Sequence, residues 1–208
     1  MAITGRDAAQ LDEAGRRMGA AAASSLKILQ ADVRAHDQVG EAVRSTVESF
    51  GGLDVLVNNA GVGVFRPVSD MTPHQWADVI DTNLTGVYNC CHVAIPHLRS
   101  RGGGYIVNIS SLAGKNSFVG AAAYCASKAG LNAFSEALMM ELRQENIRVT
   151  YIMPGSVATG FSGGDEHAGI GWKIGPSDIA ELVLDLLRMS PRTLPSRIEV
   201  RPSKPPSK

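Results

Sequence analysis

The stretch Tyr105–Phe134 reads YIVNISSLAGKNSFVGAAAYCASKAGLNAF, and it contains the change of pattern that decides the fold. Residues 105–109 are short, rich in β-branched side chains and preceded by three glycines, which predicts a strand. Residues 121–142 hold good helix formers and apolar residues spaced by three and four, which predicts a helix. The Ser-, Gly- and Asn-rich residues between them predict an exposed loop of the kind that carries function.

Three side chains of this stretch are placed to act on one substrate oxygen. Tyr124 and Lys128 are four residues apart on the predicted helix, so they share one face. A nearby ammonium favours the tyrosinate, so we expect a lowered pKa for Tyr124, which suits a general acid or base. Ser111 follows the strand, at the edge where open parallel sheets bind ligands. A lone Tyr-x-x-x-Lys pattern is more often structural than catalytic, so the serine is needed to favour a site.

Strands and helices alternate along the rest of the chain. Strands are expected near residues 2–4, 27–30, 53–57, 105–109, 148–152 and 198–200. Helices are expected near residues 8–18, 36–50, 72–99, 121–145 and 177–189. This alternation predicts a doubly wound parallel α/β sheet in three αβα layers, with residues 1–208 forming one domain.

Composition excludes several classes of partner. The 208 residues are 44% hydrophobic and 19% charged, as in an ordinary soluble domain. Lys+Arg and Asp+Glu number 20 each, which argues against nucleic acid or a membrane surface as a partner. The sequence shows neither an apolar run long enough to span a membrane nor a signal-peptide pattern. The three cysteines have no metal-ligand spacing, so we expect a reduced, cytoplasmic chain without a metal site.

Ser111, Tyr124 and Lys128 resemble, in type, order and spacing, the active-site segment of the short-chain dehydrogenase/reductase family. The resemblance implies a Rossmann-like fold and an NAD(P)-dependent oxidoreductase that interconverts a small alcohol and a ketone. It implies that Tyr124 exchanges a proton with the substrate oxygen and that Ser111 positions this oxygen. Lys128 would lower the pKa of the tyrosine and hold the nicotinamide ribose. Family members pair through helices that match residues 72–99 and 121–145, so we expect a homodimer or homotetramer.

Two further motifs match the family. Asn83 lies within a predicted helix, where asparagine is a poor helix former, so its presence indicates a local role. By resemblance it is the asparagine that holds a water in the proton relay. The sequence pattern alone, without the resemblance, predicts a surface residue. The motif Asn58–Gly61 follows a strand and alone reads as a tight turn. By resemblance Asn59, Ala60 and Gly61 contact the adenosine side of the cofactor.

The segment after the strand near 148–152 resembles the Pro-Gly motif that contacts the nicotinamide, although it also reads as a plain turn. The resemblance assigns this contact to Pro154, Gly155, Val157 and Thr159. The Gly-rich residues from 159 to 174 are expected to close over the substrate. Their large candidates for lining the pocket are Phe161, His167 and Trp172.

Further residues expected to contact the adenosine side of the cofactor lie within the first 33 positions. Arg6 matches a position where a basic residue favours the 2′-phosphate of NADP over the hydroxyl of NAD. Asp7 beside it could favour NAD, so NADP is the preferred expectation and NAD remains possible. Asp32 and Val33 resemble the Asp-Val pair that touches the adenine.

The Gly-rich phosphate loop of the family has no match. The family starts with a strand, Thr-Gly-x-x-x-Gly-x-Gly and a helix, whereas Thr4-Gly5 is followed by no glycine before Gly15. We therefore expect the chain to start at the family's second strand and to lack one strand–helix unit of roughly 30 residues. The first strand could move into the vacant place, another subunit could cover it, or residues 1–50 could be weakly held; we expect a rearranged or weakened first half. The alternative function is then a cofactor-deficient, non-catalytic subunit or binding fold.

Overall fold

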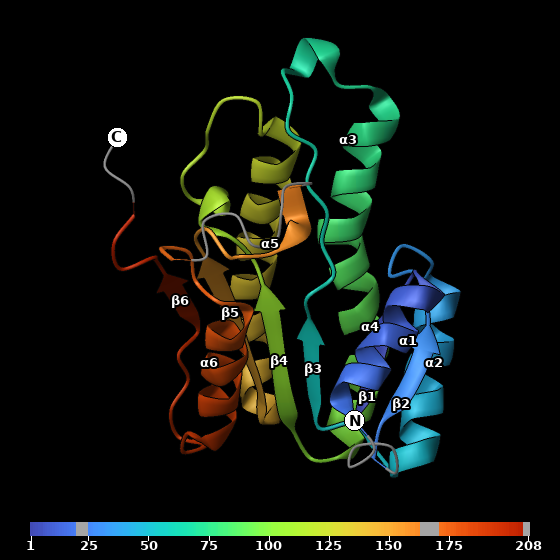
Figure 1. The fold of residues 1–208 in the computed structure, drawn as a ribbon. Coiled ribbons are helices and arrows are strands. Elements are labelled where there is room, and N and C mark those ends of the chain that lie inside the picture. The colour runs from blue at the N-terminus through green and yellow to red at the C-terminus, as the bar shows by residue number, and fades with distance from the viewer. Residues whose placement is uncertain (20–24, 163–170, 206–208) are drawn as a thin grey trace.

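The computed structural model describes residues 1–19, 25–162 and 171–205, and it has the predicted Rossmann-like α/β architecture (Figure 1). The strands are β1 (Ala2–Gly5), β2 (Lys27–Gln30), β3 (Val55–Asn58), β4 (Gly104–Ile109), β5 (Ile147–Pro154) and β6 (Arg197–Val200). The helices are α1 (Ala8–Met18), α2 (His36–Phe50), α3 (Pro73–Ile80), α4 (Gly86–Ser100), α5 (Ala122–Leu142) and α6 (Pro176–Arg188). The predicted alternation is confirmed, with bounds that shift by up to two residues at most ends.

The strands form two parallel sheets instead of one. One sheet has the order β3-β4-β5-β6, and the other consists of β1 and β2. Among the described residues no strand pairing joins β1 to β3. The first strand therefore has not moved into the vacant place, and the expected rearrangement is wrong in this respect. Whether residues 1–50 are weakly held stays a prediction.

The larger sheet is covered by helices on both faces, which completes the three layers. Ile106 of β4 packs with Leu131 of α5 and Leu98 of α4 on one face. Tyr105 and Val107, which point the other way, pack against Leu186 of α6. Because β4 is buried on both faces, its residues are apolar almost without interruption, as is typical of parallel sheets.

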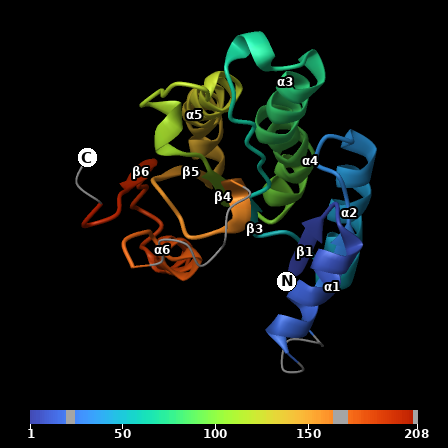
Figure 2. The same ribbon diagram turned by 45° about the horizontal axis from the view of Figure 1, so that its top comes forward.

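The smaller sheet lies beside α4, with α1 and α2 packed on it (Figure 2). Helix α2 contacts α4, and Asn89 of α4 donates a hydrogen bond of 2.9 Å to the backbone oxygen of Val33. Few side chains are buried here, and Ile28 of β2 is 39% exposed. The smaller sheet is thus attached to the rest of the molecule mainly through α2 and α4.

The long helix predicted for residues 72–99 is interrupted by a π-helical turn. Thr72 and Gln75 form a capping box at the start of α3, which explains the helix beginning at Pro73. Residues Asp81–Thr85 then form the π-helical turn before α4 continues to Ser100. Asn83 falls inside this turn, and π-helical turns of this kind are frequent at functional sites. The helix predicted to reach residue 145 ends at Leu142 and is followed by a 3₁₀ turn.

Candidate active site

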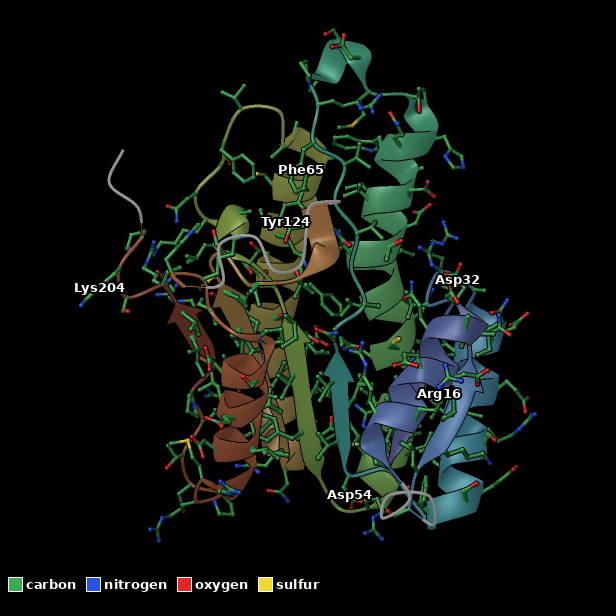
Figure 3. All side chains as sticks on the ribbon, in the orientation of Figure 1. Arg16, Asp32, Asp54, Phe65, Tyr124 and Lys204 are labelled. Carbon is green, nitrogen blue, oxygen red and sulfur yellow. The ribbon has the colours of Figure 1, made fainter. Side chains whose placement is uncertain are left out.

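A cavity of about 1460 Å³ opens at the carboxyl ends of β3, β4 and β5. Ser111, Tyr124 and Lys128 all line it, so the structure brings the three residues singled out from the sequence together. Figure 3 shows Tyr124 on α5, facing the segment that follows β3 and carries Phe65. This is the edge at which open α/β sheets bind ligands.

Ser111 caps the short 3₁₀ turn Leu112–Gly114 that follows β4. Its hydroxyl accepts a hydrogen bond of 3.1 Å from the backbone nitrogen of Ala113. The turn packs tightly on α5, since a Cβ atom added to Gly114 would lie 2.7 Å from the backbone of Lys128. This close approach brings Ser111 near enough to Tyr124 that its hydroxyl acts on the pKa of the tyrosine.

The pKa of Tyr124 is raised, and the expected lowering is wrong for this structure. Burial of the ring and hydroxyl raises the pKa most, while the hydrogen bond with Ser111 lowers it. Lys128 exerts no resolved effect, because its Nζ atom lies 5.9 Å from the centre of the tyrosine ring and is directed elsewhere. Sharing a helix face with Lys128 therefore did not lower the pKa of the tyrosine.

Lys128 is 4% exposed, and its Nζ atom donates a hydrogen bond of 2.9 Å to the backbone oxygen of Ile109 at the end of β4. Burial of the ammonium lowers its pKa to about 8. An ammonium has three N–H groups, so beyond this bond it can donate to hydroxyl groups of a molecule in the cavity.

Asn83 is fully buried and supports the site through hydrogen bonds to Val62 and Ser127. Its Oδ1 atom accepts a hydrogen bond of 2.8 Å from the backbone nitrogen of Val62, and its Nδ2 atom donates to the Val62 oxygen at 2.9 Å. Nδ2 also donates to the Ser127 hydroxyl at 3.0 Å. A Cβ atom on Gly61 would lie 3.4 Å from Asn83 Oδ1 and 3.8 Å from Lys128 Nζ. The asparagine thus fixes the segment after β3 against α5.

All four residues expected to contact the nicotinamide line the same cavity, together with two of the three motif residues that were expected on the adenosine side. The lining includes Asn59, Gly61, Pro154, Gly155, Val157 and Thr159. Ala60 is exposed between two of these residues but does not line the cavity. Val157 is held by an isolated parallel bridge to Ile174, so this wall has a defined backbone path.

The adenosine-side residues expected in the first 33 positions lie elsewhere. Arg6 and Asp32 line a second cavity of about 490 Å³ at the end of β1 and β2. Asp32 is hydrogen-bonded by the Arg34 guanidinium, which holds the pKa of its carboxyl below the usual value. Val33 lines neither cavity and packs against Gly86, where a Cβ atom would come within 2.6 Å.

Two aromatic residues of the large cavity were missed from the sequence. Phe65 and Phe118 line it together with Phe161, which was expected there. The signal was available, since Phe65 follows the Asn-Asn-Ala-Gly motif and Phe118 precedes the helix of Tyr124. Trp172 is not among the described lining residues, and His167 lies outside the described residues.

The motif that begins with Asn58 resembles a family signature that stabilises the central sheet, but the partners of Asn58 were missed from the sequence. Asn58 donates to Asn108 Oδ1 at 2.8 Å, and Asn108 donates to the Ser135 hydroxyl at 2.9 Å. These bonds join β3, β4 and α5, so the first asparagine of the motif holds the sheet together.

The described residues contain no group of three or more His, Cys, Asp or Glu side chains arranged to hold a metal ion. Within the same residues, none of the helices combines the length and apolar character needed to cross a membrane.

Comparison with known proteins defines the class. The family model described as short chain dehydrogenase matches residues 1–168. A protein named as an uncharacterized oxidoreductase of Staphylococcus saprophyticus is 32% identical over 200 residues, which cover 96% of this chain and 85% of the relative. The chain therefore belongs to the short-chain dehydrogenase/reductase family of NAD(P)-dependent oxidoreductases.

Solved structures of similar proteins have the same fold. The crystal structure of a metagenomic short-chain oxidoreductase in complex with NADP has a TM-score of 0.83 and 33% identity, covering 98% of this chain and 86% of its own. Serine dehydrogenase from Escherichia coli has a TM-score of 0.82 and 30% identity, covering 96% of this chain and 84% of its own.

Proposed function

We propose that the chain interconverts a ketone and a secondary alcohol with NADP(H), using Tyr124 as the general acid and base. The observation that carries this proposal is the convergence of Ser111, Tyr124 and Lys128 on one cavity at the end of β4. Family membership supports the class of reaction, and the NADP complex of the metagenomic relative supports the cofactor.

The cavity fits the nicotinamide end of such a cofactor. Lys128 presents a buried ammonium with donor capacity beyond its bond to Ile109, which suits the hydroxyl groups of a ribose. Val157 and Thr159 supply an apolar and a polar contact on the opposite wall. When bound, NADPH supplies a hydride to the carbonyl carbon.

The turn that follows β1 does not fit the pyrophosphate of the cofactor. The Asp7 carboxylate caps α1 by accepting a hydrogen bond of 3.0 Å from the backbone nitrogen of Gln10. A helix N-terminus attracts anions, but the carboxylate already fixed at this one leaves no anion site there for the pyrophosphate. We therefore assign only the nicotinamide end to the large cavity.

The protein's own groups handle the proton. Ser111 donates a hydrogen bond to the substrate oxygen and holds it beside Tyr124. In ketone reduction the Tyr124 hydroxyl gives its proton to that oxygen as the carbonyl carbon gains the hydride; in alcohol oxidation the tyrosinate takes the proton back. Burial raises the pKa of Tyr124, so the free chain holds this hydroxyl in its protonated form. We propose that Asn83 positions the cavity wall and takes part in the proton relay.

The preference for NADP over NAD rests on Arg6. Its guanidinium belongs to the second cavity, where the charge of Asp32 is neutralised by Arg34. Glu41 also lines this cavity but forms an ion pair with Arg44. The cavity thus contains a basic group beside two carboxylates that already have partners, which suits a 2′-phosphate.

A homodimer or homotetramer, located in the cytoplasm, stays a prediction from the family resemblance. In support of the oligomer, α4 and α5 leave Tyr88 and Met140 exposed by 48% and 61% on their surfaces.

A second candidate function is a non-catalytic subunit that does not bind cofactor. Within the described part of the chain, β1 and β3 each have an edge without a paired strand, and this favours it together with the carboxylate at the start of α1. Failure of the chain to bind either cofactor would support this candidate, whereas cofactor-dependent turnover would exclude it.

The test is NADPH oxidation at 340 nm with a panel of ketones, in the wild type and in Tyr124→Phe. We expect this variant to lose about 10²–10⁴-fold in kcat, because the substrate oxygen loses its proton donor. Tyr88→Phe is the matched control, since Tyr88 lies exposed on α4, and it should keep full activity. Unchanged turnover in Tyr124→Phe would remove Tyr124 from the mechanism.

A further inference from the structure

Three exposed phenylalanines from separate loops gather around Tyr124. The ring of Phe65 lies 5.6 Å from that of Tyr124 in an edge-to-face arrangement, and 6.0 Å from that of Phe118 in a stacked one. Phe161 lies 5.6 Å from Tyr124 and 6.5 Å from Phe65. These centroid distances are within the range of direct aromatic contact. We refer to Phe65, Phe118 and Phe161 as the aromatic wall.

The aromatic wall retains a large accessible surface. Phe65, Phe118 and Phe161 are 42%, 53% and 42% exposed, and all three line the large cavity. The backbone approaches two of the rings closely, since a Cβ atom on Gly63 would lie 2.8 Å from Phe65 and 2.9 Å from Phe161. Because Gly63 has no side chain, both rings can pack on the segment after β3. Their remaining faces are open to the cavity.

The charged groups of the cavity do not favour a cationic substrate at this place. Among the described lining residues there is no Asp or Glu, so a cationic group would find no carboxylate. The basic lining residues are Lys128, which is bonded to Ile109, Arg201, which is paired with Glu199, and Lys173. The ring faces beside Tyr124 carry no charge and offer aromatic contact to a planar group.

We infer that the substrate carries a planar aromatic group bonded directly to the reacting carbonyl carbon, as in an aryl ketone, and that the aromatic wall binds this group. The inference rests on the proposed function, because it places the carbonyl oxygen between Ser111 and Tyr124. In the reaction the aryl ketone gains a hydride from NADPH at carbon and a proton from Tyr124 at oxygen, and it leaves as the secondary alcohol.

The test compares two ketones of similar size, acetophenone and cyclohexyl methyl ketone, by kcat/KM with NADPH. In Phe118→Ala the ratio of the two values should fall about 2- to 12-fold, which corresponds to the loss of one aromatic contact. Phe118 contacts Phe65 and not the tyrosine ring, so its removal leaves Tyr124 in place. Because only the change in the ratio is used, the different intrinsic reactivities of the ketones cancel.

Val119→Ala is the matched control, because Val119 is the next residue and is 99% exposed. It should leave the ratio unchanged, and Phe118→Tyr should keep the wild-type ratio because the ring remains. A ratio that is unaltered in Phe118→Ala overturns the inference.

A binding measurement separates this inference from the proposed function. Saturation-transfer NMR of acetophenone with the full chain needs no turnover. If the wild type reduces no ketone of the whole panel, the proposed function fails; a saturation signal that weakens in Phe118→Ala and not in Val119→Ala still supports the aromatic site. Equal signals in the three proteins contradict it.

Discussion

The four-stranded sheet and the two-stranded sheet differ in how deeply they bury their residues. Tyr105, Ile106 and Val107 of β4 are at most 1% exposed, whereas Ile28 of β2 is 39% exposed. The first sheet has an open edge at β1, and the second has one at β3. The proposed catalytic groups are anchored on the deeply buried sheet, and the groups proposed to select the cofactor are on the shallow one. Chemistry and cofactor selection thus depend on parts of the molecule that we expect to differ in stability.

The largest difference between the two sheets is expected when the same side chain is shortened in each of them. Ile106→Ala removes a side chain that is 0% exposed and should lower the free energy of unfolding by about 2–5 kcal/mol. Ile28→Ala should cost about 1 kcal/mol, because its partly exposed side chain loses less buried area. Urea denaturation of the two variants measures both values. Equal losses in the free energy of unfolding would show that the two-stranded sheet is as well packed as the four-stranded one.

The next largest effect concerns the ammonium buried at the end of β4. The pKa of Lys128 is about 8 in the folded chain and 10.5 when solvated, so the unfolded chain binds more protons between these values. Stability should therefore rise with pH from about 8 to 10.5, and the burial penalty is fully present below pH 8. Lys128→Met removes this penalty and should stabilise the chain at pH 7 by on the order of 3 kcal/mol, at about 1.4 kcal/mol per pKa unit.

The control for this change is Lys204→Met, since Lys204 is exposed in the C-terminal segment. Urea unfolding at pH 7 and pH 10 should show that Lys128→Met loses its advantage at the higher pH, while the control follows the wild type. A constant difference between Lys128→Met and the wild type at both values would mean that Lys128 is not desolvated.

The smallest effect tests the link between the two sheets. Asn89 on α4 is 5% exposed and donates to the backbone oxygen of Val33, so Asn89→Ala should cost about 1 kcal/mol. Hydrogen exchange should become faster in residues 27–50 and stay unchanged in β4. Asn116→Ala, an exposed asparagine of the other region, should change neither. Uniformly faster exchange throughout Asn89→Ala would mean that the two sheets unfold as one unit.

The order of elements and the chemistry-bearing residues were predictable because they leave local patterns. The helix 36–50 was placed at its observed bounds by its apolar spacing and by Gly51, which takes the left-handed conformation at φ 77°. The position of Ser111 after a strand and the spacing of Tyr124 and Lys128 placed three groups around one cavity.

The failures concern properties that depend on distant parts of the chain. The direction of the Tyr124 pKa shift follows from burial and from Lys128 bonding to Ile109, neither of which helical spacing reports. The π-helical turn at Asn83 depends on its bonds to Val62 and Ser127. The aromatic wall comes from three loops, and each phenylalanine alone reads as an ordinary apolar residue.

The most direct test of the central claim is calorimetric titration of NADPH and of NADH into the 208-residue chain. If the catalytic cavity and the Arg6 cavity together bind one cofactor, binding is saturable, tighter for NADPH, and weakened in Arg6→Ala toward the affinity for NADH. If neither cofactor binds, the site of Ser111, Tyr124 and Lys128 has no hydride source in this chain, and the non-catalytic function replaces the enzymatic one.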